Sequence, residues 1–227
     1  MEHFRLEQVA DDAWAAIALP DAGAVGNAGF IRVDENTIVF DTFASTTAAD
    51  ALRLAAEMIA PVAYAVNSHW HGDHVNGNGA FADVPIVASE RTSELMEERG
   101  NEVVLPTELF DERLERDGAV IETLGGGHTE SDTFLWFEDT VFTGDLVVVE
   151  SHPWVGHGDV EHWLEILDAF EARRPRVIVP GHGPVGSVDD IPPLRRYLEG
   201  LLDGTATAVD GWDFFEGHER NVEALRS

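Results

Sequence analysis

NSHWHGDHVNGNG, residues 67–79, places three histidines and one aspartate within six residues and follows them with glycine and asparagine. Imidazole and carboxylate groups are the ligands that zinc, iron and manganese take in proteins. The alternative is a polar loop whose histidines are merely hydrogen-bonded. However, the strand expected over residues 62–68 leads into this segment, and sites are commonly built at strand ends. The segment therefore predicts a metal site, and its potential ligands are His69, His71, Asp73 and His74.

The spacing within the segment divides these ligands into two pairs. Residues i and i+2 of an extended chain point the same way, so His69 and His71 can converge on one ion. Gly72 permits a turn, after which Asp73 and His74 can face a second ion beside the first. One short segment cannot complete two coordination spheres, so further ligands have to come from distant parts of the chain.

Three other loops offer such ligands, each beside an expected strand. GGGHTESD contains His128, FTGDL contains Asp145, and VPGHGP contains His182. A single histidine in a loop is more often solvated than bound to a metal, so each of these is weak evidence alone. Four loops that offer ligands at strand ends together predict a shared centre.

Apolar runs and helical patterns alternate along the chain. Strands are expected over residues 13–19, 28–33, 37–40, 62–68, 85–89, 119–124, 133–137 and 176–180. Helices are expected over residues 46–59, 89–99, 160–174 and 192–202. This order predicts mixed sheets covered by helices in one layered domain. The tail, residues 211–227, contains WDFF, which either docks on the core or belongs to an interface.

Taken together, these motifs resemble those of the metallo-β-lactamase superfamily, and the resemblance covers nearly the whole chain. The motifs are His-x-His-x-Asp-His at residues 69–74, Gly-His-Thr at 127–129, Gly-Asp at 144–145, Pro-Gly-His-Gly at 180–183 and Phe-Asp-Thr at 40–42. The resemblance implies an α+β fold, an αββα sandwich of two mixed sheets with helices outside, formed by residues 1–227 as a single domain.

The resemblance also implies two metal ions per chain, most simply zinc, with iron or manganese as alternatives. One ion would be held by His69, His71 and His128, and the other by Asp73, His74 and His182, with Asp145 bridging the two. Asp41 would orient a ligand histidine through the free N–H of its ring, or would be an ordinary aspartate at a strand end.

Hydrolytic chemistry follows from such a centre. Two adjacent metal ions lower the pKa of a bridging water, so that hydroxide is available near neutral pH. They also polarise the carbonyl or phosphoryl oxygen of the substrate. Asp73 and Asp145 would act in catalysis by holding and orienting the nucleophile.

Departures from known branches of the superfamily narrow the function. The commonest zinc β-lactamases have a cysteine where this chain has Asp145, and the chain has no cysteine. Features that mark glyoxalase II, the diiron flavoproteins and the tRNA-processing nucleases are also missing. The expected activity is hydrolysis of a small ester, thioester, lactone or amide. A mononuclear-iron persulfide dioxygenase and a non-catalytic binding protein of the same fold are the alternatives.

The stretch SHPWVGHGDVEHW, residues 151–163, is the expected substrate-contacting segment. His152 or His157 would donate a proton to the leaving group, and Trp154 would form an apolar wall. The alternative is a loop that packs its tryptophans on the core and leaves its histidines exposed. Residues 22–29, AGAVGNAG, would form either a mobile lip over the site or a glycine-rich hairpin.

Charge disfavours several classes of partner. There are 43 acidic residues against 14 basic ones, all of them arginine, and the acidic residues are spread along the chain. Adaptation to a salty cytoplasm is the favoured explanation, since high salt screens self-repulsion and carboxylates keep the surface hydrated. A net charge of −29 disfavours nucleic acid and anionic membranes, which leaves a small-molecule substrate.

Two further absences bound the location. No run of about 18 apolar residues predicts a membrane span, and the acidic start lacks the pattern of a signal peptide. The absence of cysteine excludes disulfides and thiolate metal sites. The expected location is the cytoplasm, and the sequence leaves the oligomeric state open.

Overall fold

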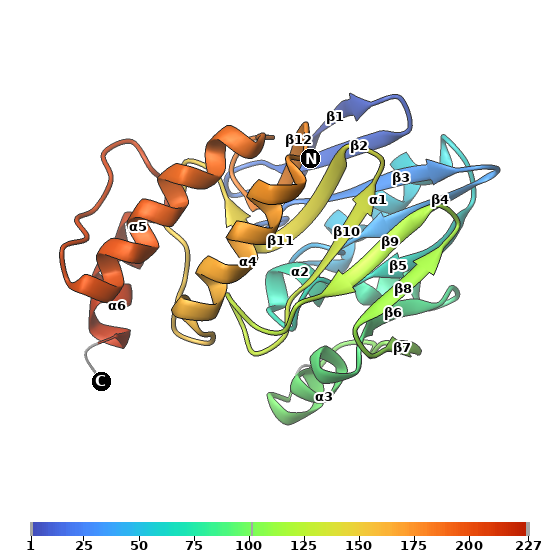
Figure 1. Ribbon diagram of the computed structural model, residues 1–227. Helices are drawn as coiled ribbons and strands as arrows, with labels where there is room; N and C mark the ends of the chain where they lie inside the picture. Colours follow the sequence, from blue (N-terminus) through green and yellow to red (C-terminus); the bar gives the residue numbers. More distant parts are fainter. Residues whose placement is uncertain (1, 101, 226–227) are drawn as a thin grey trace.

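Two β-sheets packed face to face form the centre of the structure, a computed structural model that describes residues 2–100 and 102–225 (Figure 1). Helices cover the outer faces of the sheets. This arrangement confirms the predicted αββα sandwich. Among the described residues, no helix combines the length and the apolar composition needed to cross a bilayer.

The first sheet has seven strands, which lie in the order of the chain. They are β1 (Phe4–Ala10), β2 (Ala13–Ala18), β3 (Ala28–Val33), β4 (Asn36–Phe40), β5 (Val62–Val66), β6 (Ile86–Ser89) and β7 (Glu108–Phe110). Strands β1 to β4 are antiparallel, whereas β4 to β7 are parallel. Parallel neighbours need crossover connections. These contain α1 (Thr46–Glu57), the short helices α2 (Gly72–Val75) and η1 (Asn78–Phe81), and α3 (Glu90–Glu98).

The second sheet has five strands in the order β12-β11-β10-β9-β8. They are β8 (Arg113–Arg116), β9 (Ala119–Thr123), β10 (Thr133–Phe137), β11 (Thr140–Val148) and β12 (Val177–His182). Only β11 and β12 are parallel. Helix α4 (Val160–Arg173) connects them, and η2 (Val188–Asp190), α5 (Ile191–Asp203) and α6 (Phe215–Ala224) follow.

Alternation along the strands divides the core into layers. In β4, Ile38 and Phe40 face the second sheet, where they join a cluster that includes Phe142 of β11. Val39, between them, points the other way and packs in a cluster with Leu52 of α1. Alternate residues of β4 thus pack in two different hydrophobic clusters, one on each side of the sheet.

Four strands were not predicted. One of them, β11, is a fully buried central strand whose apolar run is interrupted by Gly144 and Asp145. The other three are short or lie at an edge. β1 is exposed or half-exposed along its length and reads FRLEQVA, so its apolar alternation is weak. β7 and β8 have three and four residues and are largely polar. Edge strands bury only part of one face, which leaves little hydrophobic signal in the sequence.

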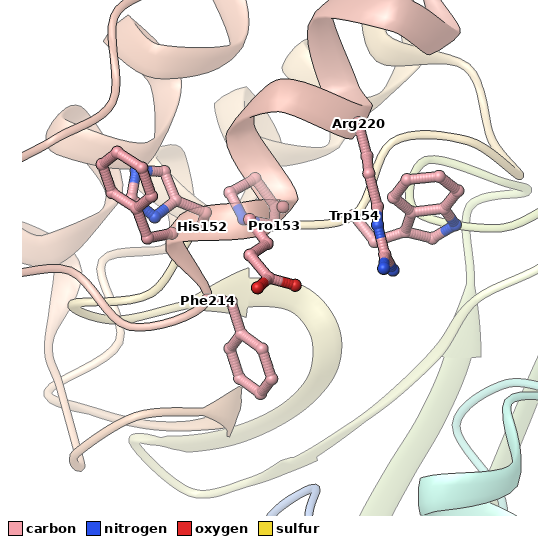
Figure 2. A pocket seen from close by; sticks show the side chains of 8 residues that line it. His152, Pro153, Trp154, Phe214 and Arg220 are labelled. Atoms are coloured by element: carbon pink, nitrogen blue, oxygen red, sulfur yellow. The ribbon is translucent and has the colours of Figure 1, made fainter.

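The tail docks on the sandwich. Asp213 forms a bridge with Ser151, next to the loop that carries His152 and Trp154 (Figure 2). Asn221 of α6 is fully buried and donates to the carbonyl of Pro153 at 2.6 Å. Of the two predicted alternatives for WDFF, docking is the one observed, although Phe214 and Phe215 remain exposed.

Candidate metal centre

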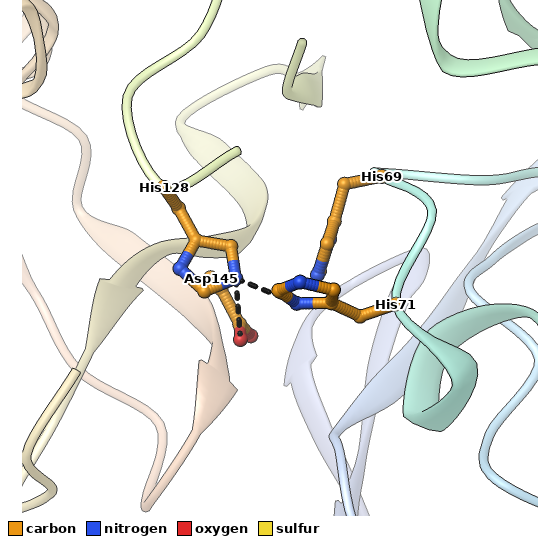
Figure 3. A group of neighbouring side chains, drawn as sticks. All are labelled: His69, His71, His128 and Asp145. Atoms are coloured by element: carbon orange, nitrogen blue, oxygen red, sulfur yellow. Dashed lines mark hydrogen bonds and ion pairs between the residues drawn. The ribbon is translucent and has the colours of Figure 1, made fainter. Parts of the chain in front are cut away.

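The seven predicted ligands come together at one rim of the sandwich. Four of them follow β5, His128 follows β9, Asp145 lies within β11, and His182 ends β12. They form two groups, and within each group the potential ligand atoms lie within 4.8 Å of one another. The first group is His69, His71, His128 and Asp145 (Figure 3). The second group is Asp73, His74 and His182.

Asp145 of β11 lies between the two groups. Its Oδ2 is 3.3 Å from Nε2 of His128 in the first group and 3.4 Å from Nε2 of His182 in the second. Its Oδ1 is 3.1 Å from Nε2 of His74. Asp73 lies at the far side, with its Oδ2 3.2 Å from Nε2 of His182. One carboxylate therefore contacts both groups, as expected of a bridging ligand.

Asp41, which follows β4, orients one histidine of each group: His74 directly and His69 through Ser68. Its carboxylate accepts the backbone N–H and the hydroxyl of Ser68, both at 2.7 Å, and Nδ1–H of His74 at 2.8 Å. Because the Ser68 hydroxyl donates to Asp41, its oxygen accepts Nδ1–H of His69 at 2.8 Å. Both rings thus donate outward through Nδ1 and present Nε2 to the centre.

The loop after β11 holds the other two histidines of the first group. Nδ1 of His128 donates to the carbonyl of Trp154 at 2.9 Å. The indole N–H of Trp154 donates to Nδ1 of His157, which makes that nitrogen an acceptor. Nε2 of His71 is therefore the donor in its 2.8 Å contact with His157. This leaves Nδ1 of His71 facing Nε2 of His128 at 2.9 Å.

Three polar atoms of the centre are unsatisfied. Among the described residues, Nε2 of His69, Nε2 of His74 and Oδ1 of Asp145 are buried without a hydrogen-bond partner. Leaving such a group unpaired costs about 1–3 kcal/mol each. All three point into the space between the two groups, where metal ions would satisfy them. The donor set of imidazole and carboxylate fits zinc, iron or manganese.

The electrostatics of the centre favour cations. Burial lowers the pKa of His71 to about 3 and holds the pKa of His69 well below its usual range, so both rings are neutral, the form that binds metal. Burial also opposes charge on His182, but Asp145 outweighs it and raises the pKa of His182 to about 10. The second group therefore stabilises a positive charge, whether a proton or a metal ion.

A family comparison agrees with this geometry. Residues 22–182 match the model of the metallo-beta-lactamase superfamily. The chain belongs to this superfamily. The matched range begins in the loop before β3 and ends at His182, so it includes all seven residues of the two groups.

Curated members of the metallo-beta-lactamase superfamily show moderate identity to the chain. "Metallo-beta-lactamase type 2" of Bacteroides fragilis is 29% identical over 154 residues, which covers 62% of this chain and 61% of the relative. "Beta-lactamase-like protein 2 homolog" of Caenorhabditis elegans is 29% identical over 134 residues, which covers 55% and 43%. The aligned parts thus span less than two thirds of these relatives.

Solved structures of metallo-beta-lactamases share the fold. The DIM-1 metallo-beta-lactamase superposes with a TM-score of 0.76 at 20% identity, covering 87% of this chain and 97% of that structure. The metallo-beta-lactamase from Pontibacter korlensis gives a TM-score of 0.74 at 23% identity, covering 86% and 99%. At this identity the likeness establishes the fold alone.

His152 of this superfamily member lines the cavity over the centre, but both of its ring nitrogens are engaged by the tail. Its Nδ1–H donates to the carbonyl of Asp213 at 2.8 Å, and its Nε2 accepts the backbone N–H of Val209 at 3.0 Å. Both ring nitrogens are thus used to fasten the tail to the loop after β11. With its N–H donated to a backbone carbonyl and its other nitrogen accepting a backbone N–H, the ring in this position has no proton free for a leaving group.

His157 is placed differently. Its Nδ1 accepts from both Trp154 and His71, so the ring lies behind a potential ligand. It is not among the residues that line the cavity over the centre. The position therefore supports an orienting contact with His71 more directly than a proton-donor role.

Sequence reasoning missed two parts of the centre. The Ser68 hydroxyl donates to Asp41 and accepts from His69, so it links the two residues. The only feature of the sequence that could have indicated this role is the position of Ser68 directly before the first histidine. The Trp154 carbonyl that orients His128 is a backbone atom, so no residue type marks it. Val25, in the predicted lip at residues 22–29, lines the cavity over the centre.

Gly181 is a position where a single methyl group is expected to disturb the centre. A Cβ there would overlap Oδ1 of Asp145 and press on the backbone at Gly144. We expect Gly181→Ala to displace the Asp145 carboxylate and to lower metal affinity and turnover by about 100-fold. Metal titration and steady-state kinetics would measure this.

The matched control for Gly181→Ala is Gly79→Ala. A Cβ at Gly79 meets only the hydroxyl of Thr46 at 3.9 Å, an ordinary contact. This variant should bind metal like the wild type. Equal behaviour of the two variants would show that the close packing of Gly181 against Asp145 has no role.

Proposed function

We propose that this superfamily member is a dinuclear zinc hydrolase that acts on a small ester, thioester, lactone or amide, with residues 1–227 working as one domain. One observation carries the proposal. Four histidines each donate their outward N–H to a fixed acceptor and present the other nitrogen to one space. Asp145 points into the same space and contacts both groups.

Two bound zinc ions would supply an activated water near neutral pH and a positive field for the oxygen on which charge develops. In this arrangement His69, His71 and His128 would hold the first ion. Asp73, His74 and His182 would hold the second.

The residues around the ions have their own tasks. Asp145 would hold the attacking water between the groups and accept a hydrogen bond from it, which fixes the direction of attack. Asp41 and Ser68 keep two imidazole rings in the orientation that presents Nε2 inward. Val148 and Trp154 line the cavity above and limit the access of further water.

The substrate class follows from what the centre lacks. The chain offers a carboxylate, Asp145, and no cysteine, which separates it from the commonest zinc β-lactamases. The excess of acidic residues opposes polyanionic substrates. A small uncharged acyl compound is consistent with both properties.

Metal analysis coupled to a substrate panel tests this proposal. The purified full chain is expected to contain two zinc ions and to hydrolyse at least one ester, thioester, lactone or amide of a panel that also contains a phosphodiester, which it should not hydrolyse. A chelator should abolish turnover and added zinc should restore it. The assays should be run in low and high salt, since a charge of −29 is expected to require screening.

Three outcomes would contradict the proposal. One iron per chain with oxygen consumption would indicate the persulfide dioxygenase. A chain that binds no metal would indicate a non-catalytic binding protein. Turnover that survives complete metal removal would show that the chemistry lies elsewhere.

A further inference from the structure

The C-terminal segment, residues 205–225, forms one wall beside the metal centre and lies outside the range that matches the superfamily. Backbone and side-chain hydrogen bonds fasten it there. The backbone N–H of Asp213 donates to the carbonyl of Glu150 at 2.8 Å, and the backbone carbonyl of Asp213 accepts from the ring of His152. The buried Asn221 donates to the carbonyl of Pro153 and accepts the backbone N–H of Val155 at 3.2 Å. The segment is therefore a fixed part of the structure.

Between this wall and the loop after β11 lies a groove of about 370 Å³ (Figure 2). Its lining includes Trp154 and Pro153 on one side and Phe214 and Phe215 on the other. Trp154, Pro153 and Phe214 also line the cavity over the centre. The groove therefore lies directly beside the cavity, and its volume is in the range of small-molecule sites.

Phe214 is held in a conformation that folding alone does not favour. Its φ is 55°, in the left-handed region, and 54% of the residue is exposed. Phe215 beside it is 61% exposed. Bulky residues rarely adopt positive φ, and exposed aromatic rings give little stability. Such features concentrate at functional sites, and here the Phe214 ring lies 5.4 Å from the ring of His182.

The groove carries no net charge, in contrast to the chain as a whole. Its two charged lining residues are Glu216 and Arg220, which stand four apart on α6 and carry opposite signs. With the aromatic walls, this balance favours an uncharged occupant over an anion or a cation.

We propose that this groove receives the non-reacting part of the substrate, and that this part is an uncharged apolar group of aromatic-ring size or larger. The inference rests on the proposed hydrolase function. It assigns specificity to Phe214 and Phe215, which the superfamily match does not include.

A comparison of short and long substrates tests the assignment. The zinc-loaded full chain is assayed with 4-nitrophenyl acetate and octanoate, and with methyl and naphthylmethyl thioacetates, so that each side of the reacting bond is varied. Phe214→Asn removes the ring but keeps a residue that tolerates positive φ. We expect the ratio of kcat/KM for the bulky to the small substrate to fall about 10-fold in one of the two series.

Two further variants complete the design. Phe215→Ala should lower the same ratio, and it keeps the test valid if Phe214→Asn does not fold. Leu54→Ala removes another exposed apolar residue, 62% exposed on α1, and should leave the ratio unchanged. An unchanged ratio in both phenylalanine variants would overturn the proposal. A loss of self-association with an unchanged ratio would show that the face is an interface between copies.

A binding measurement separates this proposal from the proposed hydrolase function. Calorimetric titration of 2-naphthylmethanol into the metal-free chain needs no turnover. We expect the wild type to bind it about 10-fold more tightly than Phe214→Asn does. Binding of the alcohol without hydrolysis of any substrate would support the proposed role of the groove and contradict the proposed hydrolase function. Equal binding by wild type and variant would contradict the proposal that the groove binds an apolar group. Tighter binding of 2-naphthoate than of the alcohol would contradict the preference for an uncharged occupant.

Discussion

Replacing Asp145 by asparagine is expected to abolish turnover while leaving the fold intact. The change keeps the shape of the side chain but removes the negative charge that lies between the two groups. Rings of His74 and His182 would then face a neutral amide at 3.1–3.4 Å in place of a carboxylate. We expect turnover to fall on the order of 10³-fold or more and the zinc content to fall below two per chain.

The control for Asp145→Asn is Asp50→Asn, the same change on the exposed side of α1. It should have the zinc content, the turnover and the circular dichroism spectrum of the wild type. If Asp145→Asn retained two zinc ions and full turnover, with an unchanged spectrum, the assignment of the bridging carboxylate would be wrong.

Replacing Asp41 by alanine is expected to cause the largest loss of stability. The carboxylate is 1% exposed and accepts two hydrogen bonds from Ser68 and one from His74. Alanine would leave three buried donors unpaired, and it would have to adopt a φ of 61°. We expect the free energy of unfolding to fall by about 3–5 kcal/mol, measured by denaturant unfolding of the metal-free chain.

Asp41→Asn separates the stability effect from the effect on the metal centre. Asparagine tolerates positive φ and still accepts a hydrogen bond, so it should destabilise less than alanine. Its amide cannot act as a charged acceptor for both Ser68 and His74. We therefore expect zinc affinity to fall about 10–100-fold in both variants, measured by competition with a chelator. Wild-type zinc affinity in Asp41→Asn would show that Asp41 is an ordinary strand-end residue.

The ligand pattern was predictable because it depends on local geometry. His69 and His71 lie two apart in an extended stretch, and Gly72 begins the short helix that turns Asp73 and His74 toward the other side. Two of the strands that deliver distant ligands, β9 and β12, were predicted from apolar runs, whereas β11, which carries Asp145, was not. The fold prediction is confirmed, and the seven residues come together as expected. That they bind two ions stays a prediction for the zinc measurement.

Several elements that the sequence did not predict have only a weak local hydrophobic pattern. β1 and β8 are edge strands whose polar residues face solvent, so hydrophobic periodicity could not reveal them. The contacts of His152 could not be predicted for a related reason. Its position in a histidine-rich loop indicated chemistry, but its hydrogen-bond partners, Asp213 and Val209, lie more than fifty residues away.

The sequence by itself determined which residue types could hold a metal, how they are spaced, and which superfamily carries that pattern. Spacing along a strand or around a turn is a property of neighbouring residues. Tertiary structure alone decided which groups orient those side chains and what lies beside them. Asp41 with Ser68, the Trp154 carbonyl and the groove at Phe214 all depend on contacts between segments far apart in the chain. No local pattern encodes such contacts, since they exist only when the two sheets and the tail have packed together.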